Sequence, residues 1–287
     1  MGKKVVSILI GVLLTAGIMY PACSSAQMAS GAKGQMPEGD WREHKRAHFI
    51  VYYHPGISEN YVRAFAGKCE NYYRSITHRL GFERFNFWLW DNRAKIFLYR
   101  TKEDYLGSTG RAAWSGASVN IKKKWISTFY FESDFFDVIL PHELSHIILR
   151  EFIGLETKTP LWFDEGTACA NEEDSLKRYF FTAKKLVEKG YYNSVAQISG
   201  ISTAESATPS VFYPVSAAVV IYLLEIYGRG RFEMFCRNLR DGEPFTLSLG
   251  KIYRIRGTED LNKKLLSYLD SKSYLEIRTG KGFKNKW

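Results

Sequence analysis

The fold is decided by the stretch Val138-Ile139-Leu140-Pro141-His142-Glu143-Leu144-Ser145-His146-Ile147-Ile148-Leu149. Its apolar residues have helical spacing, and they surround two histidines, His142 and His146, which are four residues apart. On a helix, this separation places both imidazoles on one face, one turn apart. Pro141 is expected in the first turn, where its missing N–H costs little. The stretch therefore predicts a buried helix with one polar face.

The residues on that polar face are typical of a metal site. Two neutral imidazoles one turn apart can share a zinc ion, which they bind at about 2.0–2.1 Å. Glu143 follows His142 directly, so its carboxylate can reach a water on the metal without ligating the metal itself. The alternative interpretation is two ordinary helix histidines beside a surface glutamate.

A second stretch, Leu161-Trp162-Phe163-Asp164-Glu165-Gly166-Thr167-Ala168, supplies a third candidate ligand. A helix here that packs back across the first would deliver Glu165 to the two histidines. Two histidines and one glutamate leave the fourth zinc position open for water, as a catalytic site requires. Cys169 lies four residues after Glu165, on the same helical side, and is an alternative fourth ligand.

The two stretches together resemble the gluzincin zinc metallopeptidases, specifically the peptidase MA-like group. In that group H-E-x-x-H is followed, after a similar gap, by W-x-x-E-G-x-A. The matching positions are Trp162, Glu165, Gly166 and Ala168, with Glu172 as an acidic residue further along the second helix. The resemblance extends over residues 41–269 and is sharp over 141–173. It implies a zinc peptidase with two zinc-binding helices and a small sheet whose edge strand lines the cleft.

Two further segments are interpreted through the same resemblance. Residues 116–120 stand where gluzincin aminopeptidases carry G-A-M-E-N, but Val119 replaces the glutamate that grips the free amine. We therefore do not expect aminopeptidase activity, although the strand could pair with an extended peptide. Tyr213 begins a Y-x-x-S pattern and is the candidate oxyanion donor, with Tyr191 and Tyr192 as weaker candidates. The alternative for Tyr213 is a packing role.

Histidine ligands usually donate their second N–H to an acceptor, often a carboxylate. Asp137, Asp164 and Glu172 are the candidates, and spacing alone does not choose among them. The histidines without ligand spacing are expected to be structural: His44, His48, His54 and His78.

The N-terminal residues predict export. A basic start, an apolar run and small residues give residues 1–26 the pattern of a signal peptide, so a periplasmic or secreted location is expected. Alternatives are an uncleaved N-terminal anchor and lipidation at Cys23. Residues 27–40 are predicted to be a flexible linker, and 41–287 the metallohydrolase domain. The other cysteines, Cys69, Cys169 and Cys236, allow one disulfide or buried free thiols.

Composition and patterning predict an α+β chain. Hydrophobic residues make up 45% of it, enough for a sizeable core. In the sheet part, residues 41–133, strands are expected at 48–53, 94–99, 116–120 and 128–132, with helices at 58–79 and 101–105. The helical part, residues 134–287, is expected to contain helices at 165–179, 214–227, 232–239 and 259–269. Gly81 should end the first helix.

The net charge of +10 is concentrated in the last forty residues. An anionic envelope surface is therefore one candidate partner of the basic C-terminal region, and a solvated face is the alternative. No nucleic-acid motif accompanies the charge, so nucleic acid is not an expected partner.

The sequence favours an exported zinc peptidase with Glu143 as general base and a peptide or protein substrate. The alternatives are a zinc amidase acting on cell-wall material and a catalytically silent zinc-binding envelope protein.

Overall fold

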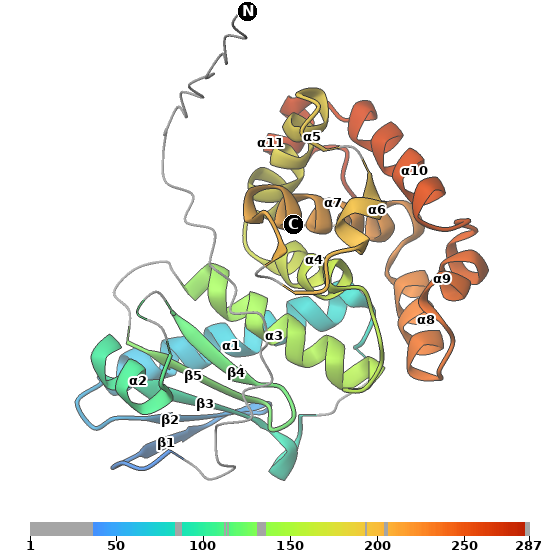
Figure 1. The fold of residues 1–287 in the computed structure, drawn as a ribbon. Coiled ribbons are helices and arrows are strands. Elements are labelled where there is room, and N and C mark those ends of the chain that lie inside the picture. The colour runs from blue at the N-terminus through green and yellow to red at the C-terminus, as the bar shows by residue number, and fades with distance from the viewer. Residues whose placement is uncertain are drawn as a thin grey trace, which may run out of the picture.

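The computed structural model describes residues 37–83, 88–111, 113, 115–130, 136–192, 194–203 and 206–284. The expected signal peptide and most of the expected linker lie outside these residues. The chain has an α+β fold, in which a five-stranded mixed sheet in the first half is followed by a mainly helical half (Figure 1). The predicted fold class is therefore confirmed.

The sheet has the strand order β1-β2-β3-β5-β4. Strands β2 (Phe49–Tyr53), β3 (Ala94–Tyr99) and β5 (Trp125–Phe129) are parallel, and they lie between two antiparallel edge strands. One edge strand, β1 (Arg42–Lys45), was not predicted, because its Arg-Glu-His-Lys sequence lacks apolar alternation. Charged residues suit an exposed edge, where they discourage pairing with other chains.

The other edge strand is β4 (Ala117–Asn120), which forms an antiparallel hairpin with β5. The strand expected at residues 116–120 is thus present. However, β5 begins at Trp125, three residues earlier than predicted, and the expected residues 131 and 132 lie outside the described part. The position of β4 at the edge leaves one side of its backbone available for further pairing.

Two helices follow the strands of the first half. Helix α1 (Glu59–Leu80) ends at Gly81 in the left-handed conformation, as predicted. Gly81 also packs closely, since a Cβ there would lie 2.8 Å from the carbonyl oxygen of Arg229. Thr101 caps helix α2 (Lys102–Thr109) by accepting a hydrogen bond from the Asp104 N–H. A short 3₁₀ helix, Trp90–Asn92, precedes β3.

The helical half contains more breaks between helices than the spacing of its apolar residues predicted. Its helices are α3 (Phe136–Ile153), α4 (Leu161–Asn171), α5 (Phe181–Glu188), α6 (Val195–Ser199), α7 (Pro209–Tyr227), α8 (Arg229–Arg240), α9 (Phe245–Ser248), α10 (Thr258–Ser271) and α11 (Tyr274–Thr279). Two π-helical turns, Leu176–Phe180 and Leu249–Tyr253, complete it.

The predicted single helix over residues 165–179 is wrong. Helix α4 ends at Asn171, Glu172 is extended, and Asp174 has a φ of 54° before the π-helical turn begins. An aspartate adopts the left-handed conformation more readily than most residues, so the break falls at a suitable residue. The apolar spacing continues across the break, which is why the pattern did not reveal it.

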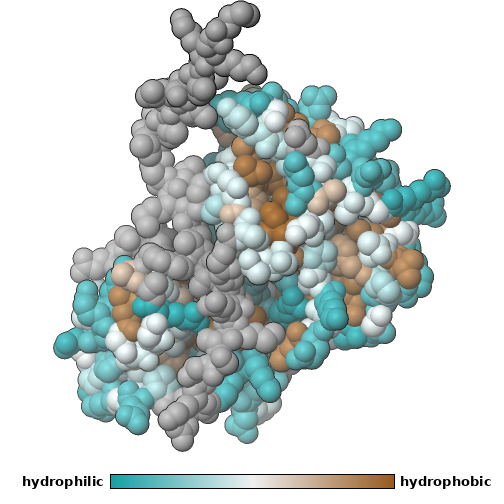
Figure 2. Space-filling model, viewed as in Figure 1, coloured by the Kyte–Doolittle hydropathy of each residue, from teal (hydrophilic) through white to brown (hydrophobic). Residues whose placement is uncertain are grey.

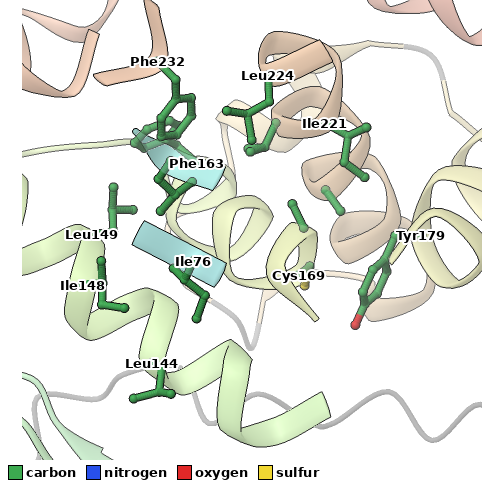
Figure 3. Packing of buried hydrophobic residues seen from close by; sticks show 14 of the residues in the cluster. Ile76, Leu144, Ile148, Leu149, Phe163, Cys169, Tyr179, Ile221, Leu224 and Phe232 are labelled. Atoms are coloured by element: carbon green, nitrogen blue, oxygen red, sulfur yellow. The ribbon is translucent and has the colours of Figure 1, made fainter. Parts of the chain in front are cut away.

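Helix α7 forms the centre of the helical half. It is long and apolar enough to cross a membrane, but 78% of its most apolar stretch is buried inside the protein. A helix that is apolar all round is expected in a core. Its Ile221 and Leu224 lie in the same cluster as Phe163 of α4 and Leu149 of α3 (Figure 3).

Polar residues cover most of the visible surface, with an apolar strip on the helical half (Figure 2).

The three cysteines outside the N-terminal region are free thiols. Cys69, Cys169 and Cys236 are all buried and unpaired with one another. The structure therefore favours the interpretation of these cysteines as small core residues over that of a disulfide.

Gly166 allows α4 and α7 to pack at backbone contact. A Cβ at this position would lie 2.3 Å from the carbonyl oxygen of Ser216, which is far inside van der Waals contact. Only glycine fits there without a shift of one helix, and Gly166 directly follows the candidate ligand Glu165.

We predict that Gly166→Ala lowers the free energy of unfolding by about 2–3 kcal/mol, because the helices must separate to admit the methyl group. Urea denaturation measures this change. The matched control is Gly67→Ala in α1, where a Cβ meets nothing within 4 Å. That substitution should be neutral or stabilising by about 1 kcal/mol. Equal stability of the two variants would contradict the packing argument.

Candidate metal centre

Helices α3 and α4 bring the three predicted ligands together. The Nε2 atoms of His142 and His146 are 3.2 Å apart, and Glu165 Oε2 lies 3.6 Å and 3.7 Å from them. Ligand atoms arranged tetrahedrally at about 2.0–2.1 Å from a zinc ion are about 3.3 Å apart. The glutamate distances exceed those of a hydrogen bond but match this spacing. His142, His146 and Glu165 can therefore hold a metal ion.

The three ligands are deeply buried, with exposed fractions of 2%, 7% and 2%. Burial lowers the pKa of His146 to about 4, against the opposing effect of the Glu165 carboxylate. The imidazole is thus neutral at physiological pH, which is the state that binds metals.

Contacts with three other elements fix α4 in place. Asp164 forms an ion pair with Arg150 of α3, and Trp162 Nε1 donates to Ser199 Oγ at 3.0 Å. At the other end, Arg79 of α1 donates to the Ala170 carbonyl oxygen at 3.1 Å, where helix carbonyls lack intrahelical partners. Glu165 is therefore presented by a helix that is held along its whole length.

The structure identifies Glu172 as the acid that supports the histidine ligands. His142 Nδ1 donates to Glu172 Oε1 at 2.8 Å, which turns Nε2 toward the other two ligands. Tyr179, on the π-helical turn, donates to Glu172 Oε2 at 2.6 Å. The other two candidate acids accept hydrogen bonds from other residues. Asp164 accepts from Arg150 and Thr159. Asp137 accepts from Lys68 and Tyr72.

Tyr179 was not predicted to belong to the site. It follows Glu172 by seven residues, a separation that matches no ligand pattern, and the turn that aims it is π-helical. Turns of this kind are frequent at functional sites, but apolar periodicity does not reveal them.

Pro141 is not in the first turn of its helix, so that prediction is wrong. Helix α3 starts at Phe136, and the missing N–H of Pro141 leaves the Asp137 carbonyl without its usual partner inside the helix. The Glu173 N–H donates to this carbonyl at 3.3 Å. Because Glu173 follows Glu172, the proline helps to anchor the segment that orients His142.

Cys169 does not complete the same ligand set. Its Sγ lies 3.9 Å from His142 Nδ1, whereas the other ligands face Nε2 on the opposite edge of the ring. Burial also raises the pKa of the Cys169 thiol to about 12.

Glu143 is half-buried beside the ligands and remains outside the ligand triangle. Burial raises the pKa of its carboxyl to about 7, and the charge of Glu165 acts in the same direction. The positive charge of Arg111, from the segment between α2 and β4, opposes this rise. Arg111 is a second residue near the site that no sequence motif indicated.

The candidate tyrosines occupy different environments. Tyr213 is buried on α7, one helical turn before Ser216, the residue that contacts Gly166 beside Glu165. Its role as an oxyanion donor stays a prediction. The Tyr192 hydroxyl donates to Asn262 at 3.0 Å, and Tyr191 is 66% exposed.

Neither the protein-family models nor the curated proteins with which the chain was compared match it. The gluzincin resemblance therefore remains a prediction that rests on the motif residues.

We predict that Glu172→Gln weakens zinc binding by about 10–100-fold, because the variant loses the charged acceptor that orients His142. Competition with a chromogenic chelator measures the affinity. The control is Asp174→Asn, an exposed acid two residues away whose left-handed backbone suits asparagine. Equal affinities of the two variants would show that Glu172 does not support the ligand.

Proposed function

We propose that this chain is an exported zinc-dependent peptidase of the gluzincin type that cleaves within peptide chains. The observation that carries the proposal is the buried triangle of His142, His146 and Glu165, with Glu143 beside it as a second acid outside the ligand group.

The donor set favours zinc among the common metals. Magnesium and calcium prefer oxygen ligands, whereas two imidazoles and one carboxylate are typical of zinc. Three protein ligands leave one coordination position for water, which distinguishes a catalytic site from a structural one.

Each residue of the site has a separate role in the proposed reaction. A bound zinc ion would supply an activated water molecule and a Lewis acid. Glu143 accepts the proton from the attacking water and returns it to the leaving amine, for which a pKa of about 7 is well suited. Tyr213 donates to the developing oxyanion. Glu172 holds His142 in position throughout.

A peptide substrate is supported by the edge strand β4. An extended chain can add to the edge of a sheet through main-chain hydrogen bonds, which suits substrates of varied sequence. Val119 stands where aminopeptidases of this type carry the glutamate that grips a free amine. Cleavage within a chain therefore fits better than removal of the first residue. Export is supported by the pattern of residues 1–26.

The first test is zinc stoichiometry on residues 27–287. We expect one zinc ion per wild-type chain, and loss or great weakening of binding in Glu165→Ala, because two imidazoles alone hold zinc poorly. Atomic absorption after dialysis gives the result. Folded wild-type protein without zinc, after metal is supplied at neutral pH, would refute the metal site.

The second test distinguishes zinc binding from catalytic turnover. Glu143→Gln should keep its zinc but lose turnover by about 10²–10⁴-fold, because the amide cannot accept the proton. Casein and peptidoglycan are assayed in parallel with the wild type. Release of peptides from casein supports the proposal, whereas cleavage of peptidoglycan alone would favour the amidase. Full activity of the glutamine variant would exclude the role of Glu143.

A further inference from the structure

One end of the sheet, far from the ligands in sequence, carries a concentration of positive charge. Strands β2, β3 and β5 all begin there, and the segments 45–48, 89–95 and 121–125 form it. These segments contain one acid, Asp91, and seven cations: Lys45, Arg46, Arg93, Lys95, Lys122, Lys123 and Lys124. We call this end the basic rim. Lys45 pairs with Glu43, and Lys124 with Glu151.

The basic rim also presents an aromatic side chain to solvent. Trp90 is 80% exposed, the largest exposed fraction among the exposed large hydrophobic residues of the described chain. Its φ of 54° lies in the left-handed region, which bulky residues rarely adopt. Arg93 Nε donates to the Trp90 carbonyl at 2.7 Å, and Lys124 bonds the neighbouring Asn92. These contacts tie down the loop whose Trp90 side chain is exposed.

The remaining parts of the basic rim are connected to Trp90. Arg93 also donates to the Arg46 carbonyl at 3.1 Å, which joins the loop to the end of β1. At β5, Lys123 lies 4.6 Å and Lys95 5.8 Å from the ring centroid of Trp125. The cations and the two indoles therefore form one continuous surface.

We propose that the basic rim docks this protein onto an anionic phospholipid bilayer, with Trp90 at the level of the headgroups. Tryptophan prefers the interface between membrane and water, and lysine and arginine are attracted to anionic lipid. A nucleic-acid surface is disfavoured, because such surfaces offer several aromatic platforms for stacking. Here the lysines cover Trp125, and only Trp90 protrudes.

The basic rim, and not the basic C-terminal region, is then the expected site of contact with the envelope. Several cations of that region serve intramolecular contacts, since Lys251 pairs with Glu243 and Lys272 donates to the Gly282 carbonyl. Within the basic rim, Lys124 binds Glu151 on α3, the helix that carries His142 and His146. Docking through the basic rim would therefore orient the metal centre relative to the bilayer.

The test is sedimentation of residues 27–287, which contain every described strand and helix, with vesicles. One vesicle type contains phosphatidylglycerol and phosphatidylcholine, and the other phosphatidylcholine alone. The variant Arg46→Glu/Lys122→Glu reverses two exposed cations of the basic rim. The matched control, Lys263→Glu/Lys281→Glu, makes the same charge change at exposed C-terminal positions. A third variant, Trp90→Asn, removes the indole and suits the left-handed backbone.

We expect the wild type to bind the anionic vesicles at least tenfold more tightly than the neutral ones. The basic-rim variant should lose at least about tenfold in affinity and Trp90→Asn several-fold, whereas the control should change less than twofold. Circular dichroism confirms that all variants are folded. Equal losses in the basic-rim and control variants, or no loss in Trp90→Asn, would overturn the proposal. Tighter binding to an oligonucleotide than to anionic vesicles would also overturn it. These measurements do not involve zinc or turnover, so their failure is separate from failure of the proposed function.

Discussion

The backbone contact between Gly166 of α4 and Ser216 of α7 is the constraint on which the rest of the structure depends. Helix α4 lies against both α3 and α7, so its position is set by the closest approach that its residues permit. A side chain larger than hydrogen at residue 166 would push α4 away from α7 and displace Glu165, the residue directly before it. Close packing of this kind transmits small changes in volume directly, because interiors contain little free space. The position of the candidate ligand Glu165 thus depends on a neighbouring residue that supplies no ligand atom.

The buried acid that supports His142 is compensated by hydrogen bonds. Glu172 has no exposed side-chain surface, yet it accepts hydrogen bonds from both His142 and Tyr179. Burying a carboxylate is costly unless it is satisfied in this way. The helix break at residues 172–174 makes the arrangement possible, since an extended Glu172 lies where a continued helix could not place it. The proline in α3 supports the break by leaving a carbonyl for Glu173. Pro141 in α3 and the break after α4 therefore both help to position the imidazole of His142.

The sheet and the helical half have different roles around the same helix. Helix α3 carries the two histidines in its middle, while its last turn contacts the sheet through the ion pair between Glu151 and Lys124. Peptide recognition is proposed for β4 at the edge of the sheet, and membrane contact for the end at which its parallel strands begin. Both surfaces belong to the first half of the chain, whereas the candidate ligands His142, His146 and Glu165 belong to the helical half. The three candidate ligands thus all come from the helical half, and a continuous core joins this half to the sheet.

The sequence by itself determined the class of fold, most of the strands and the three residues that form the ligand triangle. His142 and His146 were readable because a helix converts a separation of four residues into proximity, and Glu165 because its motif has a recognisable spacing. Only the tertiary structure decided which acid supports His142, that Tyr179 and Arg111 lie near the site, and that Cys169 faces the opposite edge of the ring. Those relations depend on how separate elements pack and where a helix breaks, and no local pattern encodes either. The strand β1 was missed because its charged sequence lacks apolar alternation, and the break after Asn171 because the apolar spacing continues across it.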